Sequence, residues 1–176
     1  IDDITETDCT TDSFTTAGNG LVYGSTCTVS ADSTPTVSVA AGAFSDASGN
    51  TNSVSNTYSW TQDDTGPTMT ITSATVDSGS DTNTAAVVLV YTSNEATSDF
   101  AEADITETGC STGTFTTTST TVYGSTCTAS SEGTPTVLVA AGAFNDATSN
   151  DNTASNTLHM DLRHHGPDHR NHVDCK

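Results

Sequence analysis

The sequence has very few basic residues. Lys and Arg together number 3 against 22 Asp and Glu, so the formal net charge is −19. No Lys, Arg or His occurs before His159. Such a chain would repel a phosphate backbone, which excludes nucleic acid as a partner. Salt bridges between side chains are excluded over the same stretch, so we expect burial, backbone ladders and disulfides to hold the fold together.

Long apolar runs are also missing. The sequence contains no run of about 18 apolar residues, the length that a membrane-spanning helix requires, and we therefore expect no membrane span. Hydrophobic residues make up only 32% of the chain. However, Thr alternates with Val, Ile, Leu and Phe, and this period of two favours half-buried strands over disorder. Because no helical period accompanies it, we predict an all-β fold.

Patterns that carry catalysis are absent. There is no Ser–His arrangement and no Gly-rich phosphate loop, and no two of the many carboxylates are marked as an acid–base pair. We therefore expect no enzymatic activity. The Asn-x-Ser/Thr signal for N-linked glycosylation is missing too. The Thr-rich segment 113–121 could carry O-linked glycans, although exposed strand positions explain the same residues without any sugar.

What the sequence does contain is a long internal repeat. The segment Asp3–Cys9 recurs as Asp104–Cys110, and Val22–Thr28 recurs as Val122–Thr128, at offsets of 100 or 101 residues. The segments that begin at Thr34 and Val39 recur in the same way. This offset equals the size of one β-sandwich domain and is far longer than a solenoid repeat.

We predict one complete unit over 63–161, built from about seven strands. The expected strands are Thr68–Ala74, Ala85–Thr92, Ala103–Thr108, Gly113–Thr118, Thr121–Ala129, Thr134–Ala140 and Ala154–Met160. Seven short alternating strands separated by turn residues predict tandem Ig-like β-sandwich units, each made of two packed sheets.

Residues 1–62 match only the later part of such a unit. The counterparts of the first two strands are not among them, so apolar surface and unpaired backbone groups would be exposed, which invites strand addition. Two interpretations stand. A neighbouring copy supplies the strands and so builds a filament, or the strands lie upstream in a longer chain.

The C-terminal residues 162–176 form an atypical tail. From Leu158 onward Ser and Thr vanish, while His, Arg and Lys appear. Shifting the implied codons of 158–176 by one base places Trp at the position equivalent to Trp60 and restores the Thr-rich repeat. One hypothesis is that the tail is a frame-shifted start of the next repeat. The alternative is a genuine His-rich tail that binds Zn²⁺ or Ni²⁺.

Four of the five cysteines form two equivalent pairs, Cys9 with Cys27 and Cys110 with Cys127. Each predicted disulfide would stabilise its unit by roughly 3 kcal/mol in the chain-entropy model. A zinc site is the rival interpretation, but two Cys without a nearby His do not complete four ligands. Paired cysteines indicate an oxidising compartment, so we expect an extracellular or cell-surface location. Cys175 is the odd cysteine.

Acidic turns are candidate Ca²⁺ sites, because Ca²⁺ prefers six to eight oxygen ligands. The candidate ligands are Asp63, Asp64, Asp46, Asn50, Asp146 and Asn150. The pair Asp63 and Asp64, at the junction between the repeats, is the strongest of these. None of the loops matches an EF-hand, and Asp and Asn also build ordinary solvated turns.

Several residues carry a resemblance to a known family. They are the segment Ser93–Thr97, Phe100, Ala103–Thr106, Val122-Tyr123, Thr136–Ala143 and the closing loops Asp46–Asn50 and Asp146–Asn150. This pattern resembles the bacterial Ig-like domains of large tandem-repeat surface adhesins. The resemblance implies an Ig-like fold and a stalk, spacer or adhesive role. The Cys pairs and the lack of basic residues depart from the family pattern, and a fold analogy alone does not choose among these roles.

We therefore expect a structural repeat unit of an extracellular fibre, filament or cell-surface stalk, whose partner is another copy of itself or a neighbouring repeat. The alternative is an adhesin module that binds glycans or a partner protein. An exposed aromatic cluster would favour the binding role. We expect Tyr23, Tyr58, Trp60 and Tyr123 in the core instead.

Overall fold

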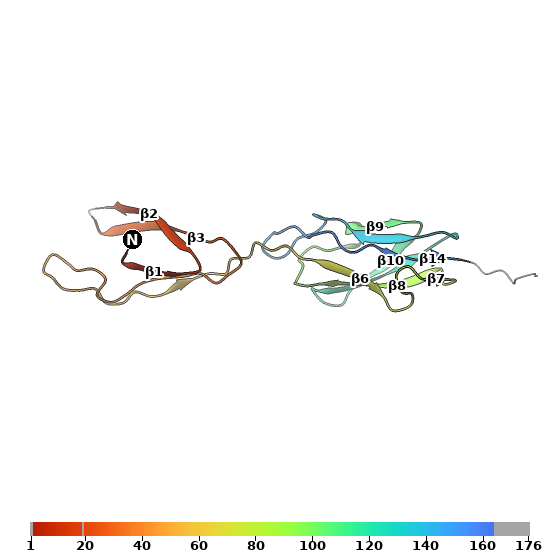
Figure 1. The fold of residues 1–176 in the computed structure, drawn as a ribbon, viewed down its shortest axis with the longest axis horizontal. Coiled ribbons are helices and arrows are strands. Elements are labelled where there is room, and N and C mark those ends of the chain that lie inside the picture. The colour runs from red at the N-terminus through yellow and green to blue at the C-terminus, as the bar shows by residue number, and fades with distance from the viewer. Residues whose placement is uncertain (1, 19, 164–176) are drawn as a thin grey trace, which may run out of the picture. The chain divides into compact units, whose positions relative to one another are not determined.

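The computed structural model describes residues 2–18 and 20–163. The chain divides into two compact units, Ile1–Thr65 (unit 1) and Gly66–Lys176 (unit 2). The boundary therefore lies three residues after the expected one at 62/63. Figure 1 shows the strands of both units.

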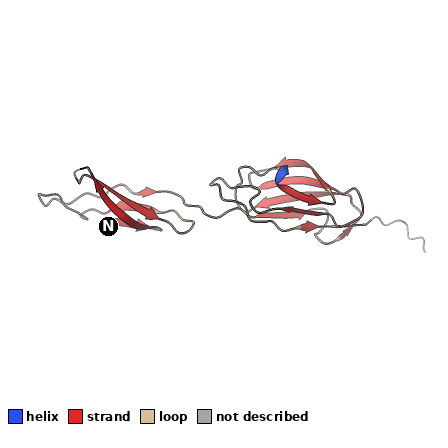
Figure 2. Ribbon diagram, turned by 90° about the horizontal axis from the view of Figure 1, so that it is seen from above, coloured by secondary structure: helices blue, strands red, loops and turns tan. Residues whose placement is uncertain are grey.

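Unit 2 is built almost entirely from strands, and a single 3-10 turn, η1 (Glu102–Asp104), is the only helical element among its described residues. The strands are β6 (Met69–Ser73), β7 (Asp81–Thr82), β8 (Ala86–Ser93), β9 (Ile105–Thr108), β10 (Ser111–Thr117), β11 (Val122–Thr128), β12 (Thr136–Val139), β13 (Leu158–His159) and β14 (Asp161–Leu162). They form a four-stranded sheet in the order β10-β11-β8-β6 and a three-stranded sheet in the order β13-β12-β9, and β14 pairs with β7. Figure 2 shows that unit 2 consists mainly of strands and loops. This architecture confirms the predicted all-β sandwich.

The core of unit 2 lies between these two sheets. Along β8 the apolar side chains Val87, Leu89 and Tyr91 are buried, as the alternating sequence predicts, and they belong to one cluster with Val137 of β12. Burial of an aliphatic or aromatic side chain of this size contributes about 1.5–3 kcal/mol. Residues from both sheets therefore depend on each other for their burial.

Each of the seven predicted strand segments contains a strand, but the last one is much shorter than expected. The segment Ala154–Met160 was expected to be extended throughout, whereas β13 spans only Leu158–His159. The Ser155 hydroxyl instead accepts a hydrogen bond from the backbone N–H of Val139. The two-residue strands β7 and β14 were not predicted, because two residues are too few to show alternation.

Unit 1 repeats part of this arrangement. Its strands are β1 (Ile4–Thr7), β2 (Thr10–Ala17), β3 (Val22–Thr28), β4 (Thr36–Val39) and β5 (Tyr58–Ser59). They form a three-stranded sheet β1-β4-β5 and a two-stranded sheet β2-β3. Counterparts of β6 and β8 are not present among the described residues of unit 1, as the sequence predicts.

The strands that both units possess pair in the same register. Ile4 lies opposite Val39 in unit 1, and Ile105 lies opposite Val139 in unit 2. The hairpins β2-β3 and β10-β11 also share an irregularity, after Asp12 in one and after Gly113 in the other. The local backbone of unit 1 is therefore that of a sandwich from which two strands are missing.

The segment from Leu158 to Leu162, where the composition changes and the atypical tail begins, takes part in the fold of unit 2. Leu158, Met160 and Leu162 are buried, with exposed fractions of 1%, 2% and 2%. His164–Lys176, which include Cys175 and the residues proposed as a metal-binding tail, lie outside the described residues. Neither the frame-shift hypothesis nor its alternative is therefore tested. No helix of the described residues is long and apolar enough to cross a membrane.

Candidate functional site

The most distinctive feature of the described chain is a set of exposed apolar side chains in unit 1, which we together call the open face. It comprises the side chains whose counterparts lie in or against the core of unit 2, namely Phe14, Tyr23, Phe44 and Tyr58. Their exposed fractions are 42%, 59%, 54% and 64%. In unit 2, the counterparts of the last three are almost fully buried, with exposed fractions of 4% for Tyr123, 1% for Phe144 and 1% for Leu158.

The expectation that Tyr23 and Tyr58 belong to a core is therefore wrong. The physical reason is the missing strand pair, since in unit 2 the core cluster is completed by residues of β6 and β8 such as Ile71, Leu89 and Tyr91. In unit 1 the aromatic rings contact one another instead. The ring centroids of Phe14 and Tyr23 lie 5.7 Å apart, and those of Tyr58 and Trp60 are also separated by 5.7 Å.

A free backbone edge accompanies the open face. Strand β3 has the sequence Val-Tyr-Gly-Ser-Thr-Cys-Thr, which is identical to that of β11. Strand β11 pairs with β10 on one side and with β8 on the other. Strand β3 pairs only with β2 among the described residues. Its second edge therefore presents unpaired N–H and C=O groups of the kind to which another strand can add.

An asparagine side chain marks where β6 lies in unit 2. Asn156 accepts a hydrogen bond from the backbone N–H of Ile71 at 2.7 Å and donates one to the Ile71 carbonyl at 2.9 Å. Its own position is set by Ser155, whose hydroxyl donates to the Asn156 carbonyl at 2.7 Å. Asn156 thus holds both backbone groups of one residue in the incoming strand.

Unit 1 has the same Ser-Asn arrangement at Ser55 and Asn56, but no strand equivalent to β6 lies beside it among the described residues. The Ser55 hydroxyl donates to the Asn56 carbonyl at 2.7 Å and accepts from the backbone N–H of Val39 at 2.8 Å, as Ser155 does in unit 2. Asn56 is exposed. The sequence analysis missed Asn56 and Asn156, although the repeated Ser-Asn-Thr at 55–57 and 155–157 could have identified them.

Both predicted disulfides are present. Cys9 is bonded to Cys27, and Cys110 is bonded to Cys127, with Cα–Cα distances of 5.6 and 5.7 Å. Each links the segment before a hairpin to the second strand of that hairpin. Cys127 is buried with an exposed fraction of 1%, whereas Cys27 is only half-buried because no strand covers β3.

The acidic loops proposed for Ca²⁺ close on themselves through hydrogen bonds. The carboxylate of Asp46 accepts from the backbone N–H of Ser48 at 2.9 Å, from that of Asn50 at 2.8 Å and from the Asn50 amide at 2.9 Å. The Asn50 side-chain amide is the largest cause that holds the pKa of Asp46 below its usual value, and the Asn50 N–H is the next. This geometry favours an ordinary Asx-type turn.

The equivalent loop of unit 2 has the same arrangement. Asp146 accepts from the backbone N–H of Thr148 at 2.8 Å, and Asn150 donates to it from the backbone at 2.9 Å and from the side chain at 3.0 Å. Burial raises the pKa of Asp146, but these hydrogen bonds outweigh it and the pKa is lowered. The Ca²⁺ assignment stays a prediction, which a chelator-dependent melting temperature would test.

Asp63 and Asp64 take part in a turn that is organised by Asp32, a residue that the sequence analysis did not single out. Asp64 donates its backbone N–H to Asp32 at 2.5 Å, and the Thr65 hydroxyl donates to the same carboxylate. Asp63 accepts from the Thr65 N–H at 3.2 Å. The Thr65 hydroxyl and then the Asp64 N–H hold the pKa of Asp32 below its usual value.

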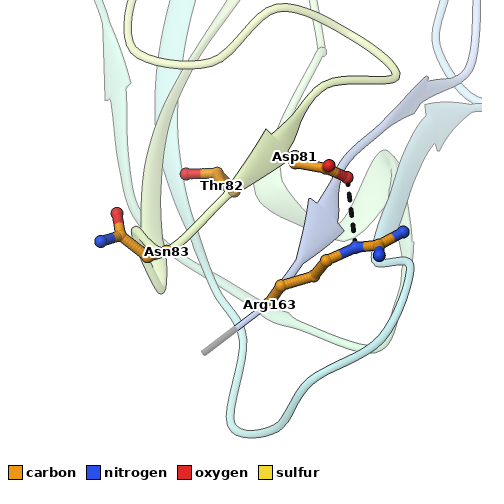
Figure 3. Close-up of a pocket in the computed structure, with 4 residues that line it drawn as sticks. All are labelled: Asp81, Thr82, Asn83 and Arg163. Atoms are coloured by element: carbon orange, nitrogen blue, oxygen red, sulfur yellow. Dashed lines mark ion pairs between the residues drawn. The ribbon is translucent and has the colours of Figure 1, made fainter. Parts of the chain in front are cut away.

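Unit 2 also has a small surface pocket, which is lined by Asp81, Thr82, Asn83 and Arg163 (Figure 3). The Arg163 guanidinium lies 3.2 Å from Asp81 and 2.5 Å from Asp161. Asp161 is the first cause that raises the pKa of Arg163. The charge of Arg163 is therefore balanced by carboxylates of β7 and β14. The residues that line the pocket include no pair of groups arranged for catalysis.

Comparison with models of known protein families finds no match, and comparison with curated protein sequences finds none either. Function is therefore inferred from the geometry of the two units.

Proposed function

We propose that the chain is a structural repeat module of an extracellular fibre, filament or cell-surface stalk, with Ig-like β-sandwich units. The observation that carries this proposal is the recurrence of one strand arrangement, with one register and one disulfide, in both units. Repetition of a stapled domain extends a chain and resists its unfolding, which is what a spacer or fibre requires.

The chemistry of the surface supports the same role. The formal charge of −19 makes neighbouring chains repel one another in solution, so that close approach requires a specific contact. Two disulfides are typical of an oxidising location outside the cell. Exposed Thr residues, such as those of β10, are candidate positions for O-linked glycans. In the structure the Ser78 hydroxyl lies 3.4 Å from Nδ1 of the exposed His159, a contact that the sequence analysis did not foresee. No catalytic role is proposed for it, because the hydroxyl and the ring lie on the surface without a further group, among the described residues, arranged to bind a substrate.

Electron microscopy of native material tests this role. We expect thin filaments or elongated stalks with a periodic subunit. Isolated compact particles, seen under conditions where the chain remains intact, would contradict it. Intact mass measurement of the same material shows whether hexose increments are present on Ser or Thr.

Single-molecule stretching provides a second test of the mechanical role. Each disulfide encloses a segment that cannot extend, with sequence separations of 18 in unit 1 and 17 in unit 2. At about 3.5 Å per residue, reduction should lengthen the unfolded chain by roughly 60 Å per unit. A contour length that does not change on reduction would contradict the proposed covalent staples.

A second candidate function is an adhesin module that binds glycans or a partner protein. The specific observation in its favour is the pair of exposed aromatic contacts, Phe14 with Tyr23 and Tyr58 with Trp60. Exposed aromatic rings supply flat apolar surfaces for recognition. Binding on a glycan array that is lost in the variant Tyr58→Ser would favour this function over the structural one.

A further inference from the structure

Unit 2 displays, in the same molecule, the contact that the open face of unit 1 lacks. Strand β8 lies along β11 over seven residue pairs, with Tyr91 opposite Tyr123 and Leu89 opposite Ser125. Strand β6 then pairs with β8, with Ile71 opposite Tyr91. Because β3 and β11 have the same sequence and the same hairpin register, the free edge of β3 offers the groups that β8 already uses in unit 2.

The side chains of the β6–β8 pair match the apolar positions that are exposed in unit 1. In unit 2 the pair contributes Ile71, Leu89 and Tyr91 to the core, with exposed fractions of 2%, 0% and 0%. Tyr91 contacts Phe100, whose centroid lies 5.0 Å from that of Phe144. Tyr23 and Phe44 of unit 1 occupy the positions equivalent to Tyr123 and Phe144. In unit 2 Phe100, which follows β8, contacts the rings of both Tyr123 and Phe144, at centroid distances of 4.9 and 5.0 Å. A segment that supplies the β6–β8 pair and an aromatic residue at the position of Phe100 would therefore cover Tyr23 and Phe44.

Two polar contacts would select such a strand pair over an arbitrary apolar one. In unit 2 the Tyr91 hydroxyl is hydrogen-bonded to the buried Ser125 hydroxyl at 2.9 Å, and the counterpart of Ser125 in unit 1 is Ser25. Asn156 holds the backbone of Ile71 by two hydrogen bonds, and its counterpart is the exposed Asn56. The Tyr91–Ser125 contact is buried and must be satisfied, which makes recognition specific. The Asn156 side chain is itself exposed, so its two hydrogen bonds fix the position of the strand backbone.

We propose that the open face of unit 1 is a receptor for a β-strand pair with the pattern of β6 and β8, and that Asn56 is the residue that clamps the backbone of the first of these strands. The occupant is a polypeptide segment that carries this repeat's own leading strands. It adds along β3 in the register that β8 has on β11, with its tyrosine hydroxyl at Ser25. Recognition is by main-chain pairing and apolar burial, as in other cases of strand addition.

This inference deepens the proposed structural role by naming what the open face binds, and it is tested separately. The probe is a synthetic peptide of residues 67–101, which includes both strands and Phe100, added to the full 176-residue chain, with hydrogen exchange followed by mass spectrometry. We expect the peptide to slow exchange at least tenfold at residues 22–28, while the already paired residues 122–128 do not change. A peptide of the same composition in scrambled order is the control.

The variant Asn56→Ala tests the clamp. Because two neutral hydrogen bonds are lost, we expect the peptide to bind roughly tenfold more weakly. The matched variant Asn156→Ala should destabilise unit 2 without this loss of affinity. Raising the salt concentration should strengthen binding, since the chain and the peptide are both acidic and carry no Lys or Arg at the contact.

Three results would overturn the proposal. The first is equal protection of residues 22–28 by the scrambled peptide. The second is unchanged affinity in Asn56→Ala, which removes the clamp. The third is a dimer of the chain that already protects residues 22–28 and excludes the peptide, because two open faces would then cover each other. Peptide binding without filaments would support this inference and contradict the proposed fibre role. Filaments without peptide binding would support the fibre role and contradict this inference.

Discussion

Tyr23 in unit 1 and Tyr123 in unit 2 occupy the same place in an identical heptapeptide, and both lie on the second strand of a hairpin with the same register. Yet the exposed fraction is 59% for Tyr23 and 4% for Tyr123. Phe44 and Phe144 differ in the same way, with 54% against 1%. Local sequence and local backbone are the same in each comparison, so neither is the cause of the difference.

The difference arises from β6, β8 and the segment after β8, in which Phe100 contacts both Tyr123 and Phe144. These strands supply one side of the core in unit 2, and their counterparts are not present among the described residues of unit 1. The comparison teaches that hairpins and disulfides form from local sequence in both units, while burial requires a strand pair that lies elsewhere in the chain. Apolar residues at core positions then form either a core or a docking surface, according to whether that strand pair is present.

The largest effect is expected from truncating the equivalent phenylalanines. Phe144→Ala should lower the free energy of unfolding of unit 2 by about 3–5 kcal/mol, because a fully buried aromatic ring is lost. Phe44→Ala should change unit 1 by less than about 0.5 kcal/mol, as for an ordinary surface position. Urea unfolding monitored by hydrogen exchange separates the two units, and Trp60 fluorescence reports on unit 1. Equal effects in both units would break the comparison.

The disulfides should also respond differently. Loss of either bridge is expected to cost its unit roughly 3 kcal/mol in the chain-entropy model. During a titration with dithiothreitol, Cys9–Cys27 should be reduced first, because Cys27 is half-buried whereas Cys127 is buried. Alkylation of the new thiols, followed by peptide mapping, measures the order. Reduction of Cys110–Cys127 at the lower concentration would contradict the difference in burial.

A smaller effect is expected from the paired serines. Ser125→Ala should destabilise unit 2 by about 1–3 kcal/mol, because the buried Tyr91 hydroxyl loses its partner at 2.9 Å. Ser25→Ala should be neutral within about 0.5 kcal/mol, since Ser25 is exposed. Thermal melts of the two variants make this comparison. If Ser25→Ala also weakened peptide binding, this would support the proposed contact between Ser25 and the tyrosine hydroxyl of the added strand.

Acid should weaken both the Asp46 and the Asp146 loop, although Asp46 is exposed and Asp146 is buried. Both pKa values are lowered below the usual 3.8 by hydrogen bonds in the folded state. Their stabilising contribution is therefore complete above the unfolded-state pKa and is lost as the pH falls through the lower, folded-state pKa. Unfolding at pH 7 and pH 3 should show a smaller difference in Asp146→Asn than in the parent chain. An unchanged difference would contradict this account.

The sequence predicted strands and disulfides well, but it did not predict the hydrogen bonds of the loops or contacts between distant residues. Alternation in segments such as Ala85–Thr92 predicted β8 closely, and the spacing of Cys110 and Cys127 predicted a disulfide that is present. The loops at Asp46 and Asp146 were identified, but their hydrogen bonding was not, because Asp and Asn serve equally as turn formers and as ligands. The strand β7 and the residue Asn156, with its counterpart Asn56, were missed, since the partners of β7 and Asn156 are 80 and 85 positions away.

The sequence by itself determined the β character, the two equivalent units, the hairpins and the disulfide pairing. These features depend on contacts between residues close in the chain or on patterns that recur within it, so short segments of sequence are enough to predict them. Only the tertiary structure decided whether the apolar side chains of equivalent hairpins, such as Tyr23 and Tyr123, are buried. Burial requires that β8 cross from the start of the unit to lie against β11, a contact between Ala86 and Thr128 that no local pattern encodes. The identical residues of β3 therefore remain exposed where that strand is absent.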